Sequence, residues 1–295
     1  MNNHKKTHLR FTRTLSSCVV LLAFFVVMLG AYTRLTDAGL GCPDWPGCYG
    51  QLILAQSPQG LQKAQLQFPN QPIETHKAWT EMAHRYAAGS LVVLIITLIG
   101  CVLTQAPYRS MLTKRLALML LCLLFFQAAL GMWTVTLKLL PIVVMGHLLG
   151  GMLIIASLTY LRGVVSSLKP LGLSQWRFGT NAGLVIVFIQ IALGGWVSSN
   201  YAGIACIGFP QCNGQWLPQL DLSAAFNPFH ALDMNYQGGV LNNQARVSIQ
   251  IIHRLGALIT TSYILGLAIL LLLWCKHKRI QCLAVMALCA VILQS

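Results

Sequence analysis

The chain has 295 residues, of which 56% are hydrophobic and 9% are charged. Together with a mean hydropathy of +0.66, this composition excludes a soluble globular domain and is typical of a protein that crosses a membrane several times. The formal net charge of +14 would suit a nucleic-acid-binding protein, but the placement of the basic residues argues against that function.

The hydropathy pattern predicts six membrane-spanning helices. A span needs about 20 apolar residues, and runs of this length lie at roughly 15–34, 80–104, 116–136, 142–161, 178–198 and 247–275. The first run follows a basic N-terminus, as in a signal peptide, but no small-residue cleavage site follows it, so it is predicted to remain as a helix. A seventh run starts near Ile280 and reaches Ser295, which is too short to span.

The basic residues fall in alternate connections between the predicted helices. The positive-inside rule places these connections and the N-terminus in the cytoplasm. The two long loops, roughly 35–77 and 199–246, then face outward. The pattern predicts a multi-pass protein of the bacterial cytoplasmic (inner) membrane. The basic residues are Lys5, Lys6, Arg10 and Arg13; Arg109, Lys114 and Arg115; Arg162, Lys169 and Arg177; and Lys276, Lys278 and Arg279.

The two halves of the chain carry the same motif. In each half a pair of cysteines six positions apart precedes a helix with a His-Arg pair. A repeat of this length indicates two copies of one structural unit. We therefore predict an all-α membrane protein with two pseudo-symmetric halves, residues 1–165 and 166–295. The copies are Cys42 to Cys48 followed by Glu81-Met-Ala-His84-Arg85, and Cys206 to Cys212 followed by Gln250-Ile-Ile-His253-Arg254.

The ten cysteines divide by location. Four lie in the outward loops, where an oxidising compartment favours disulfides, so pairing within each loop is expected. A structural zinc site is not expected, because the spacing is too wide and no nearby histidine completes a ligand set. The other six lie in apolar helices, where we expect small buried hydrophobic side chains: Cys18, Cys101, Cys122, Cys275, Cys282 and Cys289.

Three histidines are predicted to lie at one depth in the membrane. At about 1.5 Å per residue, His84, His147 and His253 each lie roughly 9–10 Å below the outer face. A histidine in hydrocarbon is costly and usually functional, and imidazoles that face each other across a four-helix bundle can bind haem iron. We expect His84 and His147 to bind one haem. The alternative for any one of them is a hydrogen bond between helices.

Glu81 precedes His84 by three residues, so both project from one face of the helix. A partly buried carboxylate at this position is suited to proton transfer. The matched residue in the second half is the uncharged Gln250. This difference predicts an active site in the first half and a structural or electron-relaying site in the second. The alternative is an interfacial ion pair of Glu81 with Lys77 or Arg85.

Two further pairs of residues have open roles. Arg85 and Arg254 each follow a predicted ligand, and we expect them either to bind haem propionates or to reach the lipid headgroups. His76 and His230 belong to the outward loops, where bracing or solvation is expected and a transient contact with substrate or metal is the alternative.

Four segments, in their order and spacing, resemble the haem A synthase family. Members of that family have eight helices in two pseudo-symmetric four-helix bundles. They oxidise the C8 methyl group of haem O to the formyl group of haem A, for use by terminal oxidases. The resemblance runs from about residue 20 to the last residue. It is carried by Gly41-Cys42-Pro43-Asp44-Trp45-Pro46, Glu81-x-x-His84-Arg85, Gln127-x-x-Leu130-Gly131-x-x-Thr134-Val135 and Gln250-x-x-His253-Arg254.

The resemblance implies roles for the residues singled out above. It implies that Glu81 is catalytic, that His84 and His147 bracket the haem O substrate, and that His253 holds a resident haem b. It also implies a functionally relevant disulfide in the first cysteine pair. A haem O synthase and oxidase assembly factors are the expected partners, and a homo-oligomer is a further expectation.

The sequence departs from the family pattern in its last helix. The family carries a fourth axial histidine on an eighth helix, whereas about seven helices fit into this chain. Gln127 precedes His147 by 20 residues, and Gln294 matches Gln127, so the missing histidine would fall near position 314. We therefore expect the sequence to be incomplete at its C-terminus.

Two other functions stay open at this stage. A membrane thiol oxidoreductase that passes electrons from a loop disulfide to a quinone would suit the outward cysteine pairs, but it would not explain Glu81 or the three histidines at one depth. A haem carrier without catalysis would use the same pocket. A thiol oxidoreductase would purify without haem and therefore without colour, unlike a haem A synthase. A carrier would keep its haem product profile in a Glu81→Gln variant, whereas a synthase would accumulate unoxidised or half-oxidised haem.

Overall fold

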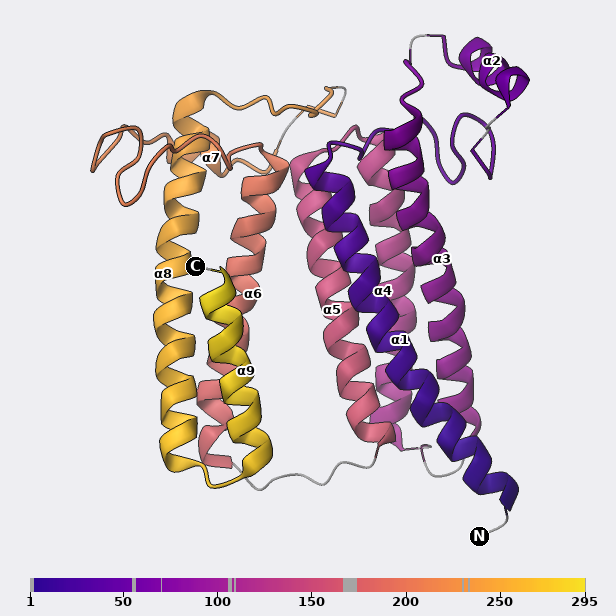
Figure 1. Ribbon diagram of the computed structural model, residues 1–295, viewed down its shortest axis with the longest axis vertical. Coiled ribbons are helices and arrows are strands. Elements are labelled where there is room, and N and C mark those ends of the chain that lie inside the picture. The colour runs from indigo at the N-terminus through magenta and orange to yellow at the C-terminus, as the bar shows by residue number, and fades with distance from the viewer. Residues whose placement is uncertain are drawn as a thin grey trace. The chain divides into compact units, whose positions relative to one another are not determined.

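The computed structural model describes residues 3–54, 57–69, 71–105, 108, 110–166, 174–229, 231–232 and 234–294. These residues form helices joined by loops (Figure 1). Six helices are long and apolar enough to cross a membrane, at the positions that the hydropathy pattern predicts. The prediction of an all-α polytopic membrane protein is therefore confirmed. The helices are α1 (Asn3–Leu35), α2 (Pro58–Gln67), α3 (Thr75–Thr104), α4 (Met111–Thr136), α5 (Pro141–Val165), the 3₁₀ turn η2 (Ser174–Trp176), α6 (Arg177–Ser199), α7 (Leu222–Ala225), α8 (Asn243–Trp274) and α9 (Lys278–Gln294).

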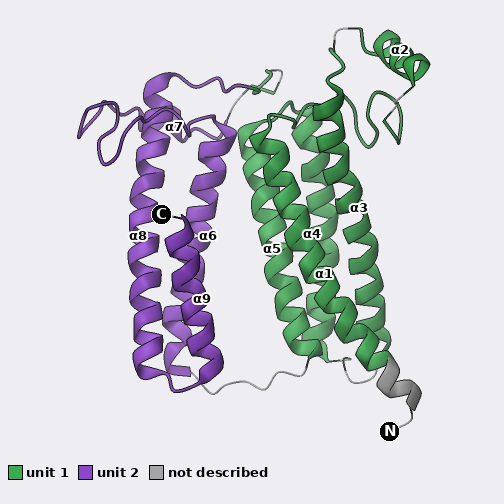
Figure 2. Ribbon diagram, viewed as in Figure 1, with its two compact units in different colours: residues 1–169, 230–237 green, residues 170–229, 238–295 purple. Residues whose placement is uncertain are grey.

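The chain divides into two compact units (Figure 2). Unit 1 comprises residues 1–169 and 230–237, and unit 2 comprises residues 170–229 and 238–295. In unit 1 the helices α1, α3, α4 and α5 each pack against two of the others and close into a four-helix bundle. In unit 2, α8 packs against both α6 and α9. Three residues that the sequence singles out, Arg109, Lys169 and His230, lie outside the described residues.

Local sequence sets the helix ends. Ser110 caps α4, since its hydroxyl accepts a hydrogen bond from the Thr113 N–H at 3.1 Å. Asn242 caps α8 in the same way, through a 2.8 Å bond from the Ala245 N–H. Pro141 occupies the first turn of α5, where the missing N–H is not needed. These residues fix where α4, α5 and α8 begin.

The core of unit 1 and the outer surface of its helices are both apolar. Leu120 is fully buried, whereas Phe125 on the same helix is 78% exposed. A run of apolar residues does not tell these faces apart, because lipid tails and a protein core are similarly apolar. For this reason the prediction that the six helical cysteines are buried is wrong for most of them. Cys275 is buried and Cys101 is partly buried, but Cys18, Cys122, Cys282 and Cys289 are exposed.

Part of the second long loop belongs to unit 1. We call its described residues within 231–237 the Tyr236 segment. The Tyr236 N–H donates to the Lys138 carbonyl at 3.0 Å, in the turn between α4 and α5. The Gln237 side chain donates to Asp37 Oδ2 at 2.9 Å, just after α1. Tyr236 is 1% exposed and packs with Leu130, Leu139, Leu140 and Val143.

Tyr236→Ala is expected to detach this segment from unit 1. Truncation of a buried aromatic ring costs about 3–5 kcal/mol, so the expected result is a lower melting temperature together with new protease cleavage sites in residues 231–237. Mass spectrometry of limited digests measures the second effect. Phe229→Ala is the control, because Phe229 is 87% exposed and its removal should change neither. An unaltered digest of Tyr236→Ala would contradict the anchoring role.

Candidate functional site

The segment from Cys42 to Cys48, which we call the first cysteine loop, lies against the start of α3. A disulfide joins Cys42 to Cys48, and both residues are buried. A Cβ at Gly41 would lie 2.5 Å from the Lys77 carbonyl carbon, so no residue larger than glycine fits at this position. The close approach brings the backbone of the loop onto the helix face that carries Glu81.

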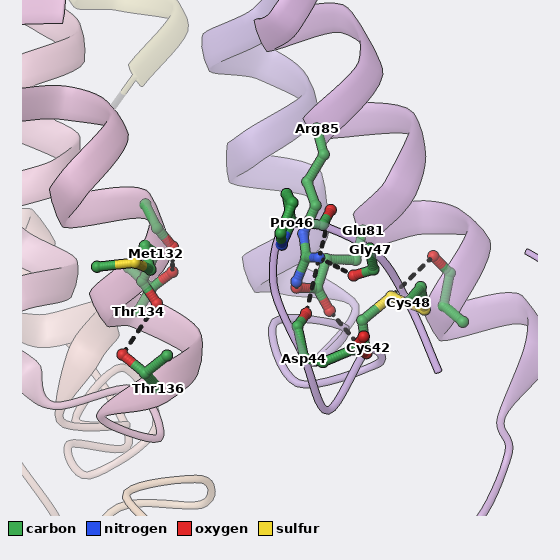
Figure 3. A network of polar contacts seen from close by, with 12 residues as sticks. Cys42, Asp44, Pro46, Gly47, Cys48, Glu81, Arg85, Met132, Thr134 and Thr136 are labelled. Atoms are coloured by element: carbon green, nitrogen blue, oxygen red, sulfur yellow. Dashed lines mark hydrogen bonds and ion pairs between the residues drawn. A yellow bond between two sulfur atoms is a disulfide. The ribbon is translucent and has the colours of Figure 1, made fainter. Parts of the chain in front are cut away.

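Glu81 is buried beneath this loop and is held at both carboxylate oxygens (Figure 3). The Cys42 backbone N–H donates to Oε2 at 2.9 Å. The Arg85 guanidinium forms an ion pair with Oε1. Glu81 itself is only 4% exposed. Because charge-assisted hydrogen bonds fix a carboxylate firmly, the position of Glu81 depends on the loop as well as on its own helix.

Arg85 also holds the loop in place. Its Nη1 donates to the backbone carbonyls of Asp44 at 2.9 Å and of Gly47 at 2.5 Å (Figure 3). From the sequence, Arg85 was expected to bind haem propionates or lipid headgroups. The structure adds a role that the sequence does not indicate, namely a clamp between the loop and Glu81. The Arg85 ion pair is also the alternative that the sequence left open for Glu81.

Unit 2 repeats the loop and the arginine but not the acid. The second cysteine pair also forms a disulfide. Arg254 donates to the carbonyls of Cys206 at 3.1 Å and Gln211 at 3.2 Å. Gln250 stands where unit 1 has Glu81, and its Oε1 is buried without a hydrogen-bond partner in the described part of the chain. The arginine therefore clamps its loop with or without a neighbouring carboxylate.

Tyr49 fixes the far side of the first loop. Its N–H donates to Asp44 Oδ1 at 2.6 Å, and its hydroxyl donates to the Pro72 carbonyl at 3.0 Å. Burial raises the pKa of the Tyr49 phenol, and the nearby carboxylates of Glu74, Glu81 and Asp44 raise it further. The phenol therefore stays neutral at ordinary pH and adds no charge beside Glu81.

His84 and His147 face each other inside unit 1. Their ring centres are 6.4 Å apart, with an angle of 83° between the ring planes. A bond from a metal to an imidazole nitrogen is about 2 Å and the ring centre lies roughly 1 Å further, so two imidazoles on one metal have centres about 6 Å apart. Both Nδ1 atoms are buried without a hydrogen bond to any described residue. The pair fits the two axial ligands of one haem iron.

A glycine faces each of the three membrane histidines. In the structure each one lies on the helix packed against the histidine's helix, and the imidazole ring lies over it. Measured from a Cβ built on the glycine to the histidine Cε1, the pairs are Gly30 with His84 at 2.9 Å, Gly131 with His147 at 3.2 Å and Gly194 with His253 at 3.4 Å.

The remaining histidines are scattered. His253 lies in unit 2 on α8, with its Nδ1 3.1 Å from the Gln190 amide nitrogen. Among the described residues of unit 2, the other histidine is His277, between α8 and α9. His76 is exposed in the first turn of α3, and His230 lies outside the described residues. Nowhere in the described ranges do three or more His, Cys, Asp or Glu side chains gather as they would around a metal ion.

Known proteins match this chain over nearly its whole length. Residues 13–295 match the family model COX15-CtaA, described as cytochrome oxidase assembly protein. The heme A synthase of Shewanella oneidensis is 44% identical over 90% of this chain and 81% of its own length. The heme A synthase of Shouchella clausii is 25% identical over 90% of this chain and 76% of its own. That of Mesorhizobium japonicum is 28% identical, covering 81% of this chain and 68% of its own.

Proposed function

The chain belongs to the haem A synthase family, and we propose that it is a membrane oxidoreductase that converts the C8 methyl group of haem O into the formyl group of haem A. The observation that carries this proposal is the buried Glu81, held by the first cysteine loop one helical turn from His84. We further propose that the enzyme works in the cytoplasmic membrane of a bacterium, with both cysteine loops on the outer face.

We assign the substrate site to unit 1. The separation of the His84 and His147 rings supports binding of the haem O iron between them. The glycines that face these rings support the assignment, because their missing side chains leave room for the imidazoles themselves to lie against the neighbouring helix. Arg85 and Arg254 stay our candidates for the haem propionates, through N–H groups that do not hold the loops.

We assign proton transfer to Glu81. Conversion of a methyl group into an aldehyde requires two successive two-electron oxidations. At each stage two electrons pass to an external redox acceptor, water supplies the oxygen and protons leave. A carbocation at the methyl carbon is trapped by water, and the final gem-diol collapses to the aldehyde. Glu81 accepts a proton from the water or stabilises the developing positive charge. The loop keeps the carboxylate fixed, so little reorganisation is needed during the reaction.

We assign a resident haem b to unit 2, where His253 would bind its iron. When bound, it supplies a one-electron redox centre. The uncharged Gln250 at the position of Glu81 supports this assignment, because it leaves unit 2 without a potential base in the corresponding place. We propose as partners a haem O synthase that delivers the substrate, oxidase assembly factors that take the product, and further copies of the chain in a homo-oligomer.

Haem analysis of the purified protein tests the proposal. The protein is extracted in mild detergent, and its bound haems are separated by chromatography. Haem O together with a hydroxylated or formyl derivative, beside haem b, is the expected result. A colourless protein would contradict it and favour the thiol oxidoreductase. Haem O that is bound but never oxidised in cells supplied with it would favour a carrier.

The three glycines provide a graded test of the histidine sites. Gly30→Ala is expected to lower the haem bound per polypeptide more than Gly194→Ala, because the added Cβ meets His84 Cε1 at 2.9 Å but His253 Cε1 at 3.4 Å. Pyridine haemochrome spectra give the haem content. Gly89→Ala on α3 is the control, since its Cβ meets nothing within 4 Å. Gly131→Ala should fall between the two, since its Cβ meets His147 Cε1 at 3.2 Å. Equal losses in Gly30→Ala, Gly131→Ala and Gly194→Ala would refute the ring-facing role.

A further inference from the structure

A partly buried glutamine connects α4 to the turn of α5 that carries His147. The Gln127 Nε2 donates to the backbone carbonyl of His147 at 2.8 Å. Its Oε1 occupies the space left by the missing side chain of Gly150, because a Cβ on that glycine would overlap the oxygen. Any larger residue at position 150 would expel the amide. The contact therefore depends on a matched glutamine and glycine from two helices.

The same arrangement recurs in unit 2. The Gln190 Nε2 donates to the His253 carbonyl at 3.2 Å and lies 3.1 Å from its Nδ1. Gly256 makes room for the Gln190 Oε1 as Gly150 does for Gln127. The two sites share one spacing in the sequence. A glutamine stands four residues before the glycine that faces the ring, and another glycine stands three residues after the histidine.

His84 lacks this amide. The residue four positions before Gly30 is Val26, and the residue three positions after His84 is Ala87. Val26 is buried in the apolar core of unit 1. A ring-facing glycine thus occurs without the glutamine, so the glutamine is not a requirement for packing two such helices together.

Stability alone does not explain the two glutamines. The Oε1 atoms of Gln127 and Gln190 are buried and accept no hydrogen bond from any described residue. A buried acceptor without a donor destabilises a fold. A leucine would fill a similar volume without leaving that acceptor. Both glutamines nevertheless hold the backbone turn of a histidine, which points to a role in fixing the imidazole.

On the basis of the proposed function, we propose that Gln127 and Gln190 are positioning residues that fix His147 and His253 toward haem iron. An iron-bound imidazole is oriented by the partners of its other nitrogen and of its backbone. The Gln190 Nε2 donates to the His253 carbonyl and lies beside Nδ1, so one amide restricts both the helical turn and the ring. Gln127 acts through the His147 backbone, and Gln190 acts through both the backbone and the ring.

The test uses ferric haem titrated into the purified protein in lipid nanodiscs. The haem site of unit 1 is identified as the one that His147→Ala removes. Gln127→Leu is expected to weaken haem binding at this site by about 10- to 100-fold. It should also broaden or shift the low-spin electron paramagnetic resonance signal of that haem and change its midpoint potential. Gln190→Leu should act in the same way on the signal that depends on His253, and each variant should spare the signal of the other unit.

Gln105→Leu is the matched control. Gln105 is also a glutamine that joins two helices of unit 1, with its Nε2 2.6 Å from Thr12 Oγ1 and a buried Oε1 that has no partner among the described residues, but it lies at the opposite end of α3 from His84. Its variant should change thermal stability without altering any haem signal. Wild-type affinity and spectra in Gln127→Leu would overturn the role of Gln127. The absence of any signal that depends on His253 would overturn the role of Gln190. A spectral change in Gln105→Leu would show that the effect is not specific to the two glutamines beside the histidines. Failure of the wild-type protein to bind haem would instead overturn the proposed function.

Discussion

Glu81→Gln is expected to lower the rate of haem A formation by about 100- to 10,000-fold while leaving haem O bound. The amide keeps the size of the carboxylate, and its oxygen can still accept from the Cys42 N–H. What is lost is the negative charge and the capacity to take a proton. The ratio of haem O and hydroxylated haem to haem A, extracted from membranes, measures the effect. Half-oxidised haem should accumulate.

The second unit supplies the matched control for this variant. Gln250→Glu makes the reverse exchange at the corresponding position, one turn from His253 rather than from His84. It should leave haem A formation close to the wild-type level, because we assign the substrate to unit 1 and the new carboxylate lies in unit 2. If Glu81→Gln kept its haem A output, or if Gln250→Glu stopped it as completely, the assignment of proton transfer to Glu81 would be wrong.

Arg85→Met is expected to cost about 3–5 kcal/mol of stability and to abolish activity. The substitution leaves the buried Glu81 carboxylate without its cation and frees the carbonyls of Asp44 and Gly47. The first cysteine loop should then open. Thermal unfolding gives the first effect. The rate at which a water-soluble phosphine reduces the Cys42–Cys48 disulfide, followed by alkylation, reports the second.

Two further variants separate the ion pair from the clamp. Arg254→Met removes the hydrogen bonds to its loop but leaves no buried carboxylate unpaired. It should therefore lower the free energy of unfolding by only about 1–3 kcal/mol. The double variant Arg85→Met with Glu81→Gln should be more stable than Arg85→Met alone, because the unpaired charge is gone. A larger loss in Arg254→Met than in Arg85→Met, or no recovery in the double variant, would contradict this account.

The membrane spans could be predicted from the sequence because their length and apolar composition follow from the thickness of a bilayer. The approach of His84 to His147 was also within reach, since equal depth on two diagonally opposite helices of one four-helix bundle leaves few other arrangements. The sequence did not predict which face of each helix lies toward lipid and which lies toward the protein core. Lipid and protein interior are similarly apolar, so the sequence did not reveal that Cys18 and Cys122 lie on the outside of the bundle.

Contacts with the backbone were the least predictable. The acceptors of Arg85 are backbone carbonyl groups of the first cysteine loop. Every residue has such a carbonyl, so the amino-acid sequence does not indicate which one accepts a hydrogen bond. The same holds for Tyr236, whose partner is the Lys138 carbonyl. The glutamine clamp did leave a signal. The shared spacing of Gln127 and Gln190 relative to their glycines can be read from the sequence once the histidines are taken as reference points.

The arginine clamp has a consequence for how the chemistry of this protein could have arisen. Arg254 holds its loop beside an uncharged Gln250, and Arg85 holds the corresponding loop beside Glu81. Codons for glutamine and glutamate differ at a single base. A duplicated unit with the loop, the disulfide and the arginine already in place therefore stands one point mutation from gaining or losing its acid. The two copies could diverge into a site for chemistry and a site for electrons without either scaffold being rebuilt.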